Sequence, residues 1–174
     1  MELTYCDRWN RVLSEPLRPF DEVEARRRHD AGELYTAISW VDGRPDAYVA
    51  VRFETTYVRC TFLDEQLRIV LTFSFDQLSV DRMFLVEARE LNPDDHSKHV
   101  ITEFEVDGTM TRKLASNDFV EVADTPLDGE ELEALYEPVP HFGQYESLLL
   151  HERDRSVGRR PASLMSESTG QDAD

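Results

Sequence analysis

A row of polar and charged side chains runs through the middle of the chain at alternate positions. Its members alternate with a row of mostly apolar residues in strand-like segments, so the row belongs on one face of a predicted sheet. Arginine binds carboxylates in a bidentate manner, and a nearby carboxylate can act as a general acid or base. The row could orient an anionic small molecule on a polar or concave face, and it could equally consist of cross-strand ion pairs in water. Its candidate ligand-binding residues are Arg52, Tyr57, Arg59, Glu87 and Glu103, with Arg89 beside them.

Arg112 is a further candidate ligand-binding residue. It stands between Met110 and Leu114, which share its parity in a strand-like segment and are predicted to point inward. Burying a guanidinium costs free energy unless it is paired, so an inward Arg112 could bind the carboxylate of a ligand. The alternative is an edge or bulged strand, with Arg112 at the rim against Glu103 or Glu105.

A dense cluster of carboxylates and imidazoles lies in a predicted loop. Such a set could bind a divalent cation or hold an acid beside a base, and it could also be a solvated loop. Its spacing matches no strong metal signature, and a third ligand would have to come from elsewhere, so no metal site is predicted. The sequence also has no phosphate loop, dinucleotide fingerprint or nucleophile elbow, and we expect no cofactor. The cluster comprises Asp94, Asp95, His96 and His99.

Eight strand-like segments position these side chains. They alternate apolar and polar residues and are joined by short turns such as Asp42–Pro45 and Asp107-Gly108. No connection is long enough for a parallel crossover, so the segments predict an antiparallel meander of about eight strands in a strongly curved sheet or barrel. The segments are Leu34–Val41, Ala47–Glu54, Thr56–Leu63, Leu67–Phe75, Met83–Glu90, Val100–Val106, Met110–Ala115 and Phe119–Val122.

Short helices are predicted to flank the meander at both termini. Asp21 and Gly32 have the residue types that cap a helix start and stop, and Asp128–Leu135 has the pattern of a second capped helix. Leu3–Leu13 fits either a helix or a strand. The fold class is therefore mainly β with some α.

The chain length predicts one domain. At 174 residues and 20.2 kDa the chain can bury a sizeable core, and we expect a globular domain over 1–155 with its β core at 33–123. Residues 156–174 are poor in large apolar side chains and are expected to be a disordered tail. Cys6 and Cys60 are expected to be reduced, packed thiols.

The charge of the chain limits its partners. A net charge of −17 disfavours nucleic acid and anionic membranes. The absence of a long apolar run or a signal-like start leads us to expect a cytoplasmic protein, and two lysines among nineteen cations suggest a GC-rich bacterial coding sequence.

Two functions fit this sequence better than a metal-assisted enzyme. The first is an acidic, soluble binding module, such as an immunity-type or accessory protein, that occupies a basic protein partner. The alternative is a small β-barrel that binds an apolar or anionic small molecule, and carries it or promotes its cyclisation or rearrangement.

Overall fold

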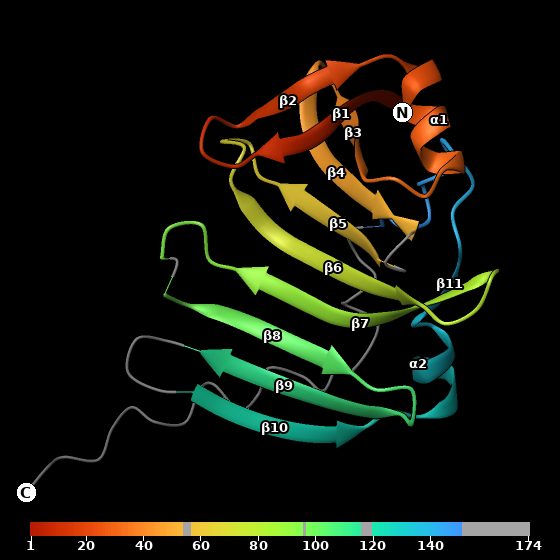
Figure 1. Ribbon diagram of the computed structural model, residues 1–174. Helices are drawn as coiled ribbons and strands as arrows, with labels where there is room; N and C mark the ends of the chain where they lie inside the picture. Colours follow the sequence, from red (N-terminus) through yellow and green to blue (C-terminus); the bar gives the residue numbers. More distant parts are fainter. Residues whose placement is uncertain (54–56, 96, 116–119, 151–174) are drawn as a thin grey trace, which may run out of the picture.

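The computed structural model describes residues 1–53, 57–95, 97–115 and 120–150, and one antiparallel sheet dominates it. Eight consecutive strands each pair with the next, which makes a meander (Figure 1). Short turns join them and leave no room for a parallel crossover, so the predicted antiparallel meander with few helices is confirmed. These strands are β3 (Tyr35–Val41), β4 (Arg44–Arg52), β5 (Tyr57–Leu63), β6 (Ile69–Gln77), β7 (Arg82–Leu91), β8 (His99–Phe104), β9 (Thr109–Ala115) and β10 (Val120–Pro126).

The turn residues close two hairpins in different ways. Asp42 and Gly43 have φ angles of 52° and 75°, as a type I′ turn requires. Between β8 and β9 only Gly108 of the Asp107-Gly108 pair has a positive φ, at 90°, and its N–H donates to the carbonyl of Glu105 over 3.0 Å. The second hairpin therefore has a longer loop in which glycine takes the left-handed position.

The ambiguous segment Leu3–Leu13 forms strand rather than helix. β1 (Glu2–Asn10) pairs with β3, and β2 (Glu15–Phe20) pairs with β1, both antiparallel. Tyr5 and Cys6 point to opposite faces of β1 and are both buried, which explains a sequence pattern that fits two periods. With these strands and β11 the sheet has eleven strands, so the prediction of about eight was too low.

Strand β7 splits the sheet. Its residues 87–91 pair with β8, whereas residues 82–84 pair with β11 (Tyr136–Pro138). Ser74 of β6 lies opposite Glu87 and Phe75 lies opposite Leu85, so Val86 is the extra residue of a β-bulge. The bulge changes the direction of β7, and β8 and β11 pair with the parts of β7 on either side of it.

The sheet is open rather than closed. In the described part of the chain, β10 and β2 are the two ends of the strand order and do not pair with each other. A barrel would require that pairing, because closure is what removes the edges of a sheet. The predicted barrel is therefore not confirmed. Strands β2 and β10 are the edges at the two ends of the sheet, and the short β11, which pairs only with β7 among the described strands, is a further edge.

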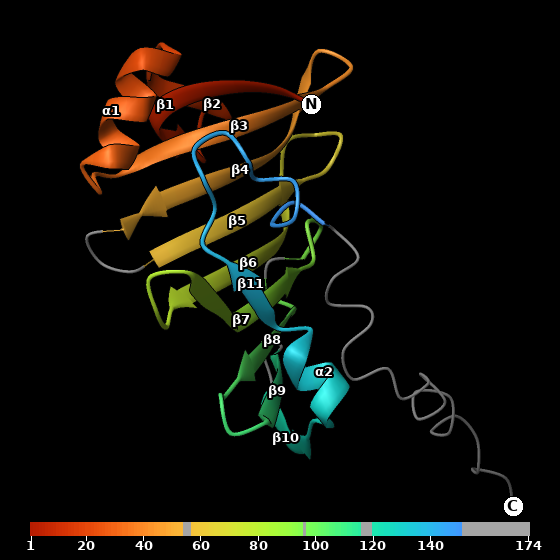
Figure 2. The same ribbon diagram turned by 90° about the vertical axis from the view of Figure 1, so that its right-hand side faces the viewer.

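The apolar face of the sheet is covered by the chain after β11. Figure 2 shows the segment that follows β11 crossing this face, with α2 (Gly129–Glu133) below it and α1 (Glu22–Asp30) at the end of the first strands. The two layers pack into one continuous core, so the space beside the sheet is filled. The largest fully buried side chains include Tyr35, Phe73, Phe75, Phe84, Leu85, Leu135, Tyr145 and Leu148.

Both helices begin at the predicted caps. The Asp21 carboxylate accepts a hydrogen bond from the Glu24 N–H, and α1 ends just before Gly32, whose φ is 71°. Asp128 and Glu131 form a reciprocal capping box at α2. Helix ends are therefore specified by short-range hydrogen bonds that the sequence displays.

Several sequence predictions concern parts that the structure does not describe. His96 and the predicted tail at 156–174 lie outside the described residues. Cys6 and Cys60 are described, buried and not bonded to each other. None of the described helices is long and apolar enough to cross a membrane.

Candidate functional site

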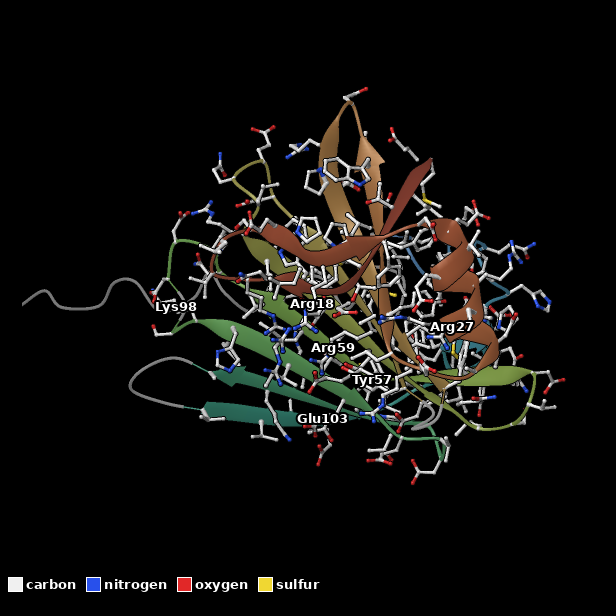
Figure 3. The ribbon with its side chains drawn as sticks, turned by 45° about the horizontal axis from the view of Figure 1, so that its top comes forward. Arg18, Arg27, Tyr57, Arg59, Lys98 and Glu103 are labelled. Atoms are coloured by element: carbon white, nitrogen blue, oxygen red, sulfur yellow. The ribbon has the colours of Figure 1, made fainter. Side chains whose placement is uncertain are left out.

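The structure brings five of the predicted site residues to one face of the sheet, which we call the polar face. Arg59 of β5 lies opposite Ser74, Ser74 lies opposite Glu87, and Glu87 lies opposite Glu103. The Arg59 guanidinium stands 5.2 Å from the centre of the Tyr57 ring and donates from Nε to Ser74 Oγ over 3.3 Å. Figure 3 shows Tyr57, Arg59 and Glu103 on the same side of the sheet.

Glu87 and Glu103 of the polar face are each paired with a cation. Arg89 Nη2 lies 3.1 Å from Glu87, and Lys113 Nζ lies 2.6 Å from both oxygens of Glu103. Glu87 and Glu103 are direct cross-strand neighbours, and like charges so placed repel unless each is paired. Cross-strand ion pairs therefore account for most of the polar face.

Two polar atoms of this face are left without partners. Thr61 Oγ1 is fully buried on β5, and Arg89 Nε is buried on β7; neither has a hydrogen bond within the described residues. Thr72 stands between them in the strand register. These two buried atoms have one strand between them, and an acceptor that reached either of them would satisfy a hydrogen bond that is not made in the structure.

Arg52 lies on the polar face as well, exposed at the end of β4 and opposite Tyr57. Arg112 has the predicted parity, because it aligns with Thr102 and Ala123 on the apolar side, but its side chain is exposed. Its exposure fits the alternative that the sequence left open, in which Arg112 lies at the rim, better than an inward guanidinium.

The loop after β7 uses its carboxylates for its own structure. Asp94 pairs with Arg68 at 2.8 Å, and Asp95 accepts from Ser97 and pairs with Lys98. These contacts keep the pKa of Asp95 below its ordinary value, chiefly through Ser97. Among the described residues no group of three potential metal ligands comes together.

A pocket that the sequence did not reveal lies at the end of the sheet beside α1. It has a volume of about 520 Å³ and is enclosed by the end of α1, the ends of β4 and β6, and the Pro138–His141 strap. We call it the histidine pocket, because His29 and His141 both line it. His29 Nδ1 lies 2.8 Å from the hydroxyl of Tyr35, which lies 2.6 Å from that of Tyr145.

Burial controls the ionisation of this hydrogen-bonded chain. It lowers the pKa of His29 and raises the pKa values of Tyr35 and Tyr145, so all three groups are held neutral. His29 was the only signal in the sequence, since Tyr145 is 110 residues from Tyr35. The chemistry available here is hydrogen bonding by a neutral, oriented imidazole.

The opposite end of the sheet is strongly acidic. Residues 103–137, which we call the acidic end, contain eleven carboxylates against Arg112 and Lys113, a net charge of −9 out of −17. This stretch forms β9, β10, α2 and β11. More than half of the excess negative charge is therefore carried by a fifth of the chain.

No protein-family model, curated protein sequence or solved structure matches the chain.

Proposed function

We propose that this protein is an acidic binding module that takes up a basic, extended segment of a partner protein along the edge of β10. The observation that carries the proposal is the contrast between the edges at the two ends of the open sheet. An unpaired edge strand presents free N–H and C=O groups to another chain, and natural sheets block the edges that are not used.

The β2 edge is blocked. Pro16 and Pro19 lack the N–H that a ladder requires, and Arg18 between them has a φ of 48°, outside the range of an extended strand. A second chain could not pair with this strand over any length. The geometry is typical of an edge protected against association.

The β10 edge has no such block over most of its length. Within the described residues β10 pairs only with β9, and its proline, Pro126, is the last residue of the strand. Val120 and Val122 are 63% and 56% exposed, so the strand offers apolar side chains as well as backbone groups. The surrounding acidic end favours a basic partner and repels an acidic one.

The packed core favours binding at the protein surface over binding of a ligand in an internal cavity. Tyr35, Tyr145 and Leu148 fill the space against the apolar face, whereas a carrier barrel needs an open interior of several hundred cubic ångströms. Association through a charged surface would be fast and salt-dependent. An immunity-type or accessory protein that occupies a basic partner fits these properties.

The test uses a peptide of alternating lysine and valine, labelled with a fluorophore. We expect it to bind the wild-type protein and to bind the Val122→Arg variant at least about tenfold more weakly, because this variant puts a cation on the docking edge. Val41→Arg, which adds the same charge at the distant β3–β4 turn, is the matched control and should bind nearly as well as wild type. Equal weakening by both variants, or no binding to wild type, would overturn docking at β10.

A second candidate function is the binding of an anionic small molecule on the polar face. Its support is the pair of unpartnered donors at Thr61 Oγ1 and Arg89 Nε, close to Arg59. The probe is benzoate, which combines a carboxylate with an apolar ring. Binding that is lost in Arg59→Gln and Arg89→Gln but retained in Arg112→Gln would support this function, and binding that none of the three changes alter would exclude it.

A further inference from the structure

The histidine pocket combines three kinds of surface. Phe53 and Val139 are part of an apolar wall, Asp30 and Asp81 contribute carboxylates, and His29 contributes one imidazole edge. None of these belongs to the β10 edge or to the polar face. The pocket is large enough for a small organic molecule.

The direction of the buried hydrogen bonds decides which nitrogen of His29 has the proton. His29 Nδ1, the Tyr35 hydroxyl and the Tyr145 hydroxyl follow one another at 2.8 Å and 2.6 Å. In the direction that we assign, Tyr145 donates to Tyr35 and Tyr35 donates to Nδ1, so the neutral imidazole has its proton on Nε2.

Nε2 is available to a ligand. Nδ1 is taken up by the buried hydroxyl of Tyr35, and His29 is one of the residues that line the pocket, so Nε2 is the ring nitrogen left for a ligand. No hydrogen bond to Nε2 occurs within the described residues. His29 thus offers a fixed N–H donor, which calls for an acceptor such as a carbonyl oxygen.

The rest of the pocket selects for charge and shape. The carboxylates of Asp30 and Asp81 favour a cation and disfavour an anionic acceptor such as a phosphate. Val139 and Phe53 suit a short aliphatic stem, and the ring face of Phe53 can also contact a cation. The net charge of the chain raises the local concentration of cations.

We propose that the histidine pocket binds a small organic cation that also bears a carbonyl group, of the chemical type of a basic amino-acid amide. The carbonyl oxygen accepts from His29 Nε2, the aliphatic stem lies along Val139, and the cationic head is directed to Asp30 and Asp81. Tyr35 and Tyr145 act as positioning residues that fix the tautomer of His29. This site is independent of the function proposed for β10.

The binding test is calorimetric titration with N-acetyl-L-argininamide. Two analogues separate the two features: N-acetyl-L-norvalinamide keeps the carbonyl groups without the cation, and butylguanidine keeps the cation without a carbonyl. We expect the complete probe to bind at least about tenfold more tightly than either analogue, since each charge-assisted or buried hydrogen bond contributes on that scale. Equal binding of all three, or no binding of the complete probe, would overturn the proposal.

Variants locate the site and separate it from β10. His29→Gln and Asp81→Asn should each weaken N-acetyl-L-argininamide binding, whereas Asp42→Asn, which neutralises a carboxylate on a distant turn, should not. Val122→Arg should leave this binding unchanged, so failure at the pocket and failure at β10 give different results. If Asp42→Asn weakens binding as much as Asp81→Asn, only the net charge is involved and the pocket is not the site.

The tautomer of His29 can be measured separately from ligand binding. Long-range ¹H–¹⁵N NMR should show His29 of the wild type protonated on Nε2, and Tyr145→Phe should give a mixture of tautomers and weaker binding of the probe. A wild-type His29 protonated on Nδ1 would contradict the assigned direction of the chain.

Discussion

At the scale of single residues, the most constrained atoms are the hydroxyls of Tyr35 and Tyr145. Both rings are fully buried, and a buried hydroxyl without a partner costs more than its hydrogen bond contributes. The 2.6 Å contact between them therefore joins α1, β3 and the covering segment after β11 through polar atoms inside an apolar core.

Removal of the Tyr145 hydroxyl tests this connection. We expect Tyr145→Phe to lower the free energy of unfolding by about 1–2 kcal/mol, because the Tyr35 hydroxyl loses a buried hydrogen-bond partner while the ring volume stays the same. Tyr136→Phe is the matched control: the Tyr136 ring packs on Phe84 and Arg82, its hydroxyl makes no hydrogen bond within the described residues, and the change should stay within about 0.5 kcal/mol. Urea denaturation of the three proteins measures the difference, and equal stability of both variants would contradict the role of the chain.

The imidazole of His29 predicts a pH dependence of stability. Burial lowers its pKa from the ordinary value of 6.5, with Asp30 acting in the opposite direction and Arg26 and His141 adding to the decrease. Between the folded pKa and 6.5 the unfolded chain binds more protons than the folded one, so stability falls as the pH falls below 6.5.

The comparison with His29→Gln isolates this contribution. Wild type should lose more stability than the variant when the pH is lowered through that interval, and above it the two curves should run parallel. The Tyr35 contact to Nδ1 should strengthen the effect, because a protonated ring could no longer accept that hydrogen bond. Denaturant melts across the pH range measure the two curves, and a variant that shows the same acid dependence would exclude His29 as its source.

The candidate sites differ in how far the sequence could predict them. Arg59 and Glu87 each belong to the polar row of an alternating strand, so the sequence could predict that they lie on the same face of the sheet. The exposure of Arg112 did not follow in this way, because strand parity gives the side of the sheet and not what covers it. His29 and Tyr145 meet only through the tertiary fold, and no local rule places residues so far apart in the chain together.

At the scale of elements, hydrogen bonds at the ends of α2 matter more than its length. The helix has five residues, too few to be stable alone, and the Asp128 carboxylate accepts from the N–H groups of Glu130 and Glu131. Asp128→Ala should cost about 1 kcal/mol of stability. Glu130→Gln, which keeps the cap, is the control, and thermal unfolding followed by circular dichroism would show whether the cap contributes as expected.

The elements also show why some parts of the fold escaped prediction. In strands β5 to β8 apolar residues alternate with polar ones, and the sequence displays this pattern directly, although the polar side of β5 and β6 is itself largely buried. β1 is buried on both faces, so its apolar residues follow neither period clearly. Whether the sheet closes into a barrel could not be predicted either. Closure depends on whether the first and last strands pair with each other, and the alternation within a single strand does not show this.

At the scale of the whole molecule, charge is unevenly distributed. Residues 1–32 have six cations and seven carboxylates, whereas the acidic end has two cations and eleven carboxylates. The two ends occupy opposite edges of the sheet (Figure 1). A basic partner would therefore be oriented before contact, with the β10 edge leading.

The uneven distribution of charge predicts how salt changes the free energy of unfolding. Repulsion within the acidic end opposes folding, and it is screened as the Debye length falls from about 30 Å at about 0.01 M salt to about 3 Å at about 1 M. We expect Glu105→Lys, at the acidic end, to raise the free energy of unfolding at low salt by up to about 0.5 kcal/mol. Glu2→Lys makes the same change of charge at the more balanced end, and it should have a smaller effect.

High salt provides the decisive comparison. If repulsion is the cause, the difference between Glu105→Lys and Glu2→Lys should disappear at about 1 M salt, because charges further apart than the Debye length no longer interact. A difference that persists would mean that Glu105 acts through a local contact in the β8–β9 turn. Chemical denaturation with urea, which adds no ions, measures both variants under each condition, and the result decides whether the acidic end is a property of the whole molecule or of one loop.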